Sequence, residues 1–454
     1  MKMTLQIGKL LIAFAALTGS YVATVSAQEK VLAIKAARII DGVHLTPLEG
    51  GIVIVRGDKI EAVGTAAQIQ IPADAKVVDL SSYTLLPGLI DTHDHPTVRA
   101  DEGGQSGAVD AWMENDGKQM LRAARNMRVS LLTGITTLCS VGENRTNDIV
   151  LASAIQSGLV PGPRIIPSGV PIASTGNPAP FRWVDGPDNV RKRVRELVAQ
   201  GAQFINIYLN DTSPTTTDMT TEEIHAAVDE AHRRGVEITA HVSGRWGTSI
   251  RAALEGGVDS LQHPQPISDE MLDLCAKYKT RLSITPTLYT LAFHATGDLW
   301  QQLDKHVSGV EEWIGLNRTL MERIIRDDPD LETKDRPLGE LNFMPGIKLY
   351  QAQLLKAHKR GIPITLGTEG HHGTLQLGVE YLVQAGFTNM EAIQAATRVA
   401  AEGIGWGKKV GTLERGKLAD MIAVEGNPSV RIRDLDKVRF VMIEGRRYDG
   451  LSFR

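Results

Sequence analysis

Short apolar runs alternate with amphipathic stretches along most of the chain, between residues 85 and 369. The amphipathic stretches at 191–201, 221–235 and 351–361 have helical spacing, and each ends in a glycine, which commonly stops a helix. The apolar runs read as buried strands, at residues 85–95, 135–142, 164–169, 204–210, 237–243, 260–264, 281–288 and 363–369. Eight strand-then-helix units predict an α/β fold, a (β/α)₈ TIM barrel. A doubly wound open sheet is the alternative, but the chain lacks its Gly-rich dinucleotide fingerprint.

The two ends of the chain show a different pattern, in which apolar and polar residues alternate as in half-buried strands. Residues 56–59 read as a hairpin turn in the first of these segments. We expect residues 28–84 and 403–454 to form a small β-sandwich domain around a barrel at 85–402. An insertion at 293–345 would lie at the C-terminal face of the barrel, where such segments act as lids or substrate walls.

The first 27 residues read as a signal peptide. Lys2 and Lys9 precede or flank an apolar core at 10–17, and Val25-Ser26-Ala27 matches the small-x-small cleavage pattern. No later stretch approaches the roughly 18–20 apolar residues of a membrane helix. We therefore expect cleavage after Ala27, no membrane contact afterwards, and a periplasmic or secreted protein.

The net charge limits the kinds of binding partner, and the cysteine positions indicate whether a disulfide is expected. The net charge of −4 over 454 residues comes without a basic stripe, so nucleic-acid binding has no support. Cys139 and Cys275 lie in segments that read as core elements, which favours two buried thiols over a disulfide. We expect a small-molecule substrate as the partner, and association into a homo-oligomer stays open.

Histidines mark the ends of the predicted strands. In "LIDTHDHP", His93 and His95 are two residues apart and project to the same side of a strand, while Asp94 projects to the other. His241 and His263 end the fifth and sixth strands. The C-terminal ends of barrel strands meet at the catalytic face, so four of the chain's 12 histidines converge there. The set predicts a site for a divalent metal.

The eighth strand adds a carboxylate in "LGTEGHH". Glu369 could ligate the metal or take a proton from water. His371 and His372 follow on the loop, where a substrate-binding role and a hydrogen-bonding role remain equally open.

Three further side chains are weaker candidates. Tyr208 and Tyr289, near the ends of the fourth and seventh strands, could donate a hydrogen bond to a substrate carbonyl, although tyrosines there are more often core or rim residues. Arg182, in the loop after the third strand, could bind a substrate carboxylate.

The segments "LPGLIDTHDHP", "AHVSG", "SLQHP", "PITLGTE" and "GTLERGKLADMIAVEGNP" resemble the amidohydrolase superfamily, in its imidazolonepropionase and prolidase-like branch. The resemblance implies a metal-dependent barrel with a split β-sandwich that hydrolyses an amide or other C–N bond of a small molecule. It assigns His93, His95, His241 and His263 as metal ligands.

The chain departs from this pattern at several positions. The branch usually carries a lysine that bridges two metals where this chain has Asn206, which lacks an amine and becomes a candidate substrate contact. The usual aspartate of the eighth strand is Glu369, and Glu143 follows the second strand where relatives tend to have Arg-Asp. These changes favour one metal ion, most simply Zn²⁺.

We therefore expect metal-activated water to attack a carbonyl, with Glu369 passing a proton to the leaving nitrogen. The substrate class would be a dipeptide, an N-acyl amino acid or a cyclic amide. A non-hydrolytic lyase or isomerase at the same site, or a ligand-binding protein without catalysis, are the alternatives.

Overall fold

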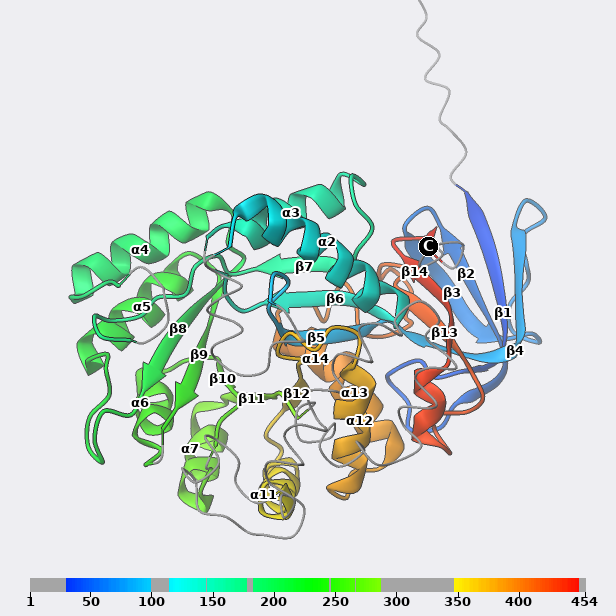
Figure 1. The fold of residues 1–454 in the computed structure, drawn as a ribbon. Helices are drawn as coiled ribbons and strands as arrows, with labels where there is room; N and C mark the ends of the chain where they lie inside the picture. Colours follow the sequence, from blue (N-terminus) through cyan, green and yellow to red (C-terminus); the bar gives the residue numbers. More distant parts are fainter. Residues whose placement is uncertain are drawn as a thin grey trace, which may run out of the picture. The chain divides into compact units, whose positions relative to one another are not determined.

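The computed structural model describes residues 30–98, 114–143, 145–177, 183–244, 246–265, 267–286 and 347–448. Within these ranges, eight parallel strands lie at the eight apolar runs that were predicted to form strands. Three of them form one sheet, in the order β5 (Leu89–Asp94), β6 (Ile135–Ser140) and β7 (Arg164–Pro167). The other five form a second sheet, made of β8 (Phe204–Asn210), β9 (Glu237–Ser243), β10 (Ser260–Gln262), β11 (Arg281–Ile284) and β12 (Ile364–Leu366). The α/β class is thus confirmed (Figure 1).

Backbone contacts join the two parallel sheets at both pairs of edges. Ile172, after β7, makes a parallel bridge to Ile207 of β8. At the other edge, the Thr368 backbone N donates to the His93 carbonyl at 2.9 Å. The described strands nevertheless form two ladders and not one closed barrel, because the connection at each edge is limited to such isolated bonds.

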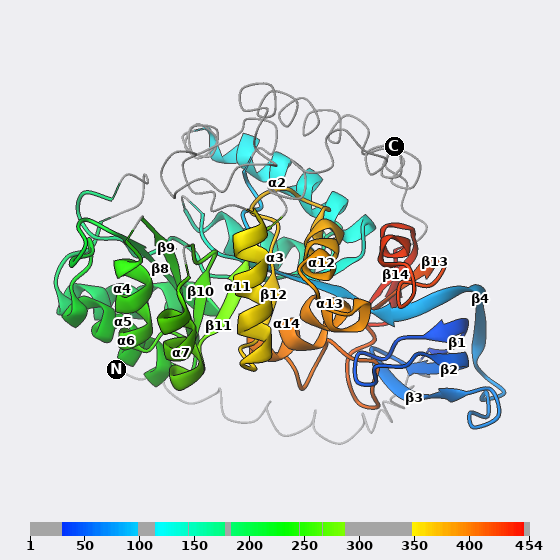
Figure 2. The ribbon, with the colours of Figure 1, turned by 90° about the horizontal axis from the view of Figure 1, so that it is seen from below.

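Helices follow the strands and cover their apolar side chains. Helix α5 begins with a capping box, in which Thr220 and Glu223 satisfy each other's backbone N–H groups, and α4 ends at Gly201 in the left-handed conformation. The helices near these sheets are α2 (Asp116–Leu132), α3 (Asn147–Gln156), α4 (Pro187–Gln200), α5 (Thr221–Arg233), α6 (Thr248–Gly256), α7 (Asp269–Tyr278), α11 (Ile347–Lys359), α12 (Leu375–Gln384), α13 (Asn389–Ala395) and α14 (Arg398–Gly403). Figure 2 shows α11 beside β12.

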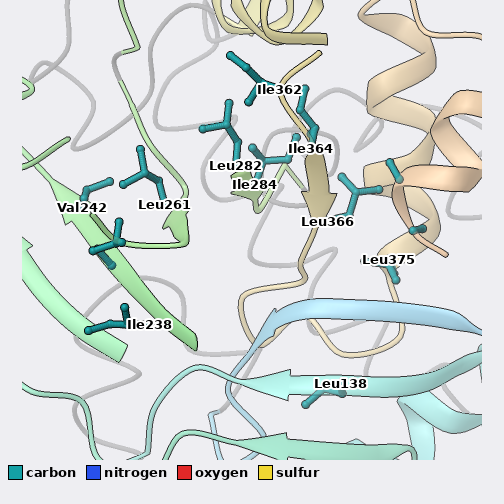
Figure 3. Close-up of a cluster of buried hydrophobic side chains, with 14 of the residues drawn as sticks. Leu138, Ile238, Val242, Leu261, Leu282, Ile284, Ile362, Ile364, Leu366 and Leu375 are labelled. Atoms are coloured by element: carbon teal, nitrogen blue, oxygen red, sulfur yellow. The ribbon is translucent and has the colours of Figure 1, made fainter. Parts of the chain in front are cut away.

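Strand alternation separates two environments within the parallel sheets. Leu261, Leu282, Ile364 and Leu366 are fully or almost fully buried in the apolar core (Figure 3). Polar residues on the opposite face of the parallel strands line an interior cavity, and include Thr92, Thr239, Gln262, Ser283 and Thr365. The residues of this polar layer lie close to the candidate site residues in the sequence, and their hydrogen bonds can orient the site side chains.

The chain ends meet in a third sheet. Its order is β15 (Arg446–Arg447), β14 (Val438–Ile443), β13 (Met421–Glu425), β4 (Lys76–Pro87), β1 (Val31–Ile39), β2 (Leu48–Arg56) and β3 (Lys59–Thr65). The turn predicted at 56–59 joins β2 to β3, with Arg56 opposite Lys59 and Gly57 at φ 62°. Both ends of the chain contribute as expected, but the described strands form this one sheet and not two facing ones.

One predicted strand began too early. Residues 85–87 belong to β4 in the seven-stranded sheet, and only at Leu89 does β5 begin. The change of sheet occurs at Gly88, where a Cβ would lie 2.1 Å from Thr136 Oγ1. Only glycine allows the chain to pass this close to β6.

Several sequence predictions fall outside the described residues: the signal peptide at 1–27, the insertion at 293–345, Arg182 and Tyr289. Within the described ranges, every helix is too short or too polar for a membrane crossing. Cys139 and Cys275 are both buried and both free thiols, as the core positions of their segments predicted.

Candidate metal centre

His93 and His95 present the same ring nitrogen to the site. The Nδ1–H of His93 donates to Gln262 Oε1 at 2.6 Å, and that of His95 donates to the Gly142 carbonyl at 2.8 Å. Each bond engages Nδ1, so Nε2 is the nitrogen of each ring that faces Glu369. Such a second hydrogen bond is how proteins orient metal-ligating histidines.

Glu369 lies against both imidazoles. Its Oε2 is 2.7 Å from His93 Nε2, and its Oε1 is 3.6 Å from His95 Nε2. One ligand atom from each of the three residues can be chosen so that all lie within 4.8 Å of one another. Glu369 adopts φ 55°, a conformation that costs a non-glycine residue about 1–3 kcal/mol. Its backbone N is held by the His93 carbonyl at 3.0 Å.

His263 and His241 extend the cluster. His263 Nε2 is 4.0 Å from Glu369 Oε2, and its ring centroid is 5.1 Å from that of His93. The His241 ring follows at 4.5 Å from His263. His263 also has a positive φ, 37°, so two strained residues lie at this one site. All four histidines predicted from strand ends are therefore contiguous with Glu369.

Burial and mutual contacts set the charge of each group in the cluster. Burial lowers the pKa of His263 to about 4 and that of His241 well below its ordinary value, so both rings are neutral at pH 7. Burial also opposes ionisation of Glu369, but the surrounding histidines outweigh it and lower the pKa of this carboxyl. For His95, the opposing effect of burial is outweighed by Glu369, which raises its pKa to about 9.

The donor set fits a divalent metal. His263 Nε2 is buried and has no hydrogen-bond partner among the described residues, and the buried His93 Nε2 and Glu369 Oε2 have none besides their contact with each other. Neutral imidazole nitrogens with one carboxylate oxygen are ligands that Zn²⁺ and its neighbours in the first transition row accept. His93 and His95 would hold the ion with help from His263 or His241, and Glu369 lies close enough either to ligate it or to act on a neighbouring water.

Asn206 and Tyr208 of β8 lie beside this cluster. Asn206 Nδ2 donates to the Val141 carbonyl, and its buried Oδ1 has no hydrogen-bond partner within the described ranges. The Tyr208 ring stacks on His241, with centroids 4.1 Å apart and planes 3° from parallel. Burial raises the pKa of Tyr208, so its hydroxyl keeps its proton at any physiological pH.

Residues 84–448 match the amidohydrolase family model. The chain belongs to the amidohydrolase family. Ochratoxinase from Aspergillus niger is 26% identical over 440 residues, which cover 88% of this chain and 82% of that protein. Imidazolonepropionase from Pseudomonas savastanoi pv. phaseolicola is 22% identical over 396 residues, covering 83% of this chain and 88% of that protein.

Solved structures show the same fold. A Xaa-Pro dipeptidase crystallised with methionine in its active site is 25% identical, with a TM-score of 0.71 over 93% of this chain and all (100%) of that one. The crystal structure of A. niger ochratoxinase has a TM-score of 0.72 at 24% identity, over 94% of this chain and 98% of that one. Family membership makes this amidohydrolase a hydrolase of C–N bonds.

Asp94, which the sequence analysis did not assign to the site of this amidohydrolase, pairs with the predicted site residue His372. Asp94 Oδ2 lies 2.9 Å from His372 Nδ1, and both side chains are fully buried. Asp94 Oδ1 accepts from the backbone N–H groups of His95 and Gly370, each at 2.8 Å. His372 thus has the hydrogen-bonding role that the sequence left open. His371 lies on the same loop and bonds through Nδ1 to the Thr368 carbonyl at 3.1 Å.

Glu143 supports the segment that carries His95. Its Oε1 accepts from the Thr97 backbone N at 3.1 Å, and its other oxygen accepts from the Thr97 hydroxyl. Burial raises the pKa of Glu143 to about 7. The loop after β6 therefore contacts residues 95–97 twice, at the Gly142 carbonyl and at Glu143.

Gly367 allows β12 to reach β5 at this site. A Cβ at residue 367 would lie 2.3 Å from His93 Cβ and 2.7 Å from the His93 carbonyl oxygen. We expect Gly367→Ala to lower the free energy of unfolding by about 1–3 kcal/mol, the usual cost of overpacking, and to displace His93. Urea denaturation measures the first effect, and metal content the second.

Gly378→Ala in α12 is the matched control, because a Cβ there meets its nearest atom at an ordinary 3.4 Å. It should leave stability unchanged or raise it by up to about 1 kcal/mol, as alanine does in helices. Equal stability of the two variants would show that the close contact at His93 is not rigid.

Proposed function

We propose that this amidohydrolase cleaves an amide or other C–N bond of a small molecule, in the class of dipeptides, N-acyl amino acids and cyclic amides. One divalent ion, Zn²⁺, would be held by His93 and His95 with help from His241 or His263. The observation that carries the proposal is the convergence of His93, His95 and Glu369, with ligand atoms within 4.8 Å of one another. The activities named for ochratoxinase and the Xaa-Pro dipeptidase support this substrate class.

Each residue around the ion would have a separate role in the reaction. A divalent metal, when bound, polarises the scissile carbonyl and makes water more acidic. Glu369 would take the proton from the attacking water and return it to the leaving nitrogen. Tyr208, which keeps its proton and stacks on His241, would donate a hydrogen bond to the carbonyl oxygen. Asn206, Arg182, His371 and Tyr289 stay candidates for substrate contact.

A single ion follows from Asn206. Its amide cannot form the carboxylated side chain that bridges two ions, and its Nδ2 is engaged by the Val141 carbonyl. We expect close to one metal per chain in wild-type protein purified without chelators, and a rise toward two in Asn206→Lys. Asn206→Met introduces a side chain similar in length to lysine but without an amine, and should keep one metal ion per chain.

The measurement is metal content by elemental analysis, paired with hydrolysis of the three substrate classes before and after metal removal. Two ions in the wild type would contradict the single-ion proposal. Absence of metal from every variant would contradict a metal-dependent hydrolase. Transfer of ¹⁸O from labelled water into the acid product should accompany turnover, and its absence would point to a lyase or isomerase.

The remaining expectations are proposals about the whole chain. The charges, apolar core and cleavage pattern in residues 1–27 support export to the periplasm or beyond. The bonds at both junctions of the parallel sheets support a closed eight-stranded barrel, with a terminal domain of sandwich type. The weak net charge supports a small molecule, and not nucleic acid, as the partner.

A further inference from the structure

A chain of three hydrogen bonds runs beneath His93, in the polar layer between the parallel strands. Thr239 Oγ1 of β9 donates to the Ser260 carbonyl at 3.2 Å. Gln262 Nε2 of β10 donates to Thr239 Oγ1 at 2.6 Å, and His93 Nδ1 donates to Gln262 Oε1 at 2.6 Å. Gln262 and Thr239 are each only 3% exposed, so these bonds are shielded from bulk solvent.

The direction of every bond in this chain follows from the first. A carbonyl can only accept, so the single hydroxyl hydrogen of Thr239 is committed to Ser260. The hydroxyl oxygen must therefore accept, which places the amide nitrogen of Gln262 toward Thr239. The amide oxygen then faces His93, and His93 must carry its proton on Nδ1.

We propose that Gln262 is a positioning residue that holds His93 in the Nδ1–H tautomer, with the Nε2 lone pair toward Glu369, because Thr239 fixes the orientation of the Gln262 amide. The inference rests on the proposed function, since what it positions is a proposed metal ligand. Nε2 of His93 is the nitrogen that lies 2.7 Å from Glu369 Oε2.

An amide at this position orients the ring without adding charge. A carboxylate on Nδ1–H would also orient it, and would make Nε2 a stronger donor. Methionine has similar length but neither donor nor strong acceptor, and would let the ring turn or change tautomer. The identity of residue 262 should therefore determine metal affinity through His93.

Zinc affinity of the metal-free protein, measured against a chromophoric chelator, tests the proposal without any substrate. Gln262→Met should bind Zn²⁺ about 10- to 100-fold more weakly, the usual loss when the outer partner of a metal ligand is removed. Thr239→Val should weaken binding in the same direction by a smaller factor. Gln262→Glu should restore affinity to the wild-type value or above it.

Ser283→Ala is the matched control. Ser283 Oγ lies in the same buried layer but bonds to Thr92 Oγ1 at 2.8 Å, so its removal should leave zinc affinity within about twofold of wild type. Thermal unfolding of each metal-free variant shows whether the fold is intact.

Equal zinc affinities for wild type and Gln262→Met would overturn the proposal, whereas a wild type that binds no zinc would overturn the proposed function itself. Should Gln262→Met not fold, Thr239→Val and the wild-type tautomer still decide. Histidine-selective ¹⁵N spectra of the metal-free wild type should show His93 protonated at Nδ1, and protonation at Nε2 alone would contradict the inference.

Discussion

Glu369→Gln should lower kcat by about 10²- to 10⁴-fold on whichever substrate the hydrolysis panel identifies, the range that a positioned general base contributes. Glutamine keeps the length and shape of Glu369 but cannot accept a proton. The carboxylate oxygen now 2.7 Å from His93 Nε2 would become a neutral amide atom. Steady-state kinetics, with metal content determined on the same sample, measure the effect.

Metal content separates the two roles open to Glu369. Loss of turnover with metal retained indicates a base, and loss of both indicates a ligand. Glu402→Gln, an exposed glutamate on α14, is the control and should keep wild-type kinetics. The proposed role is wrong if Glu369→Gln turns over substrate at the wild-type rate.

Asp94→Ala should destabilise the metal-free protein by about 3–5 kcal/mol, the cost of removing one partner from a buried pair of ionisable groups. The substitution leaves His372 without its 2.9 Å partner, and strips the backbone N–H groups of His95 and Gly370 of their acceptor. Urea denaturation of metal-free samples gives the change without a contribution from bound ion.

Two further variants test whether the loss of stability comes from the buried pair of Asp94 and His372. His372→Ala combined with Asp94→Ala should cost less than the sum of the single changes, because the two side chains share one interaction. Asp79→Ala, an exposed carboxylate that accepts from Ser81 at 3.0 Å, should cost less than about 1 kcal/mol. If Asp94→Ala were equally mild, the buried pair would not stabilise this end of β5.

The hydrophobic pattern was sufficient to locate the parallel strands, because each of them is a short apolar run in the sequence. It failed at residues 85–95, where the apolar run at 85–90 serves two sheets and the change occurs at Gly88. A local sequence pattern cannot show that a Cβ at Gly88 would lie 2.1 Å from Thr136 Oγ1. Nor could it show that the terminal strands form a single sheet among the described residues.

The histidines could be placed together from the sequence because strand ends of a barrel share one face. Gln262 could not, although it directly precedes His263 in the chain. Its importance depends on a partner from β9 and another from β5, and such contacts exist only after the strands are aligned. The same holds for Asp94 and His372, which nothing in their spacing connects.

His93 and Glu369 are close neighbours in space, yet they come from the first and the last strand of the parallel series. Almost the whole chain must be synthesised before both are present, and closing so long a loop is slow and late in folding. The complete site, with Glu369 beside His93, therefore forms only after most of the chain has been synthesised.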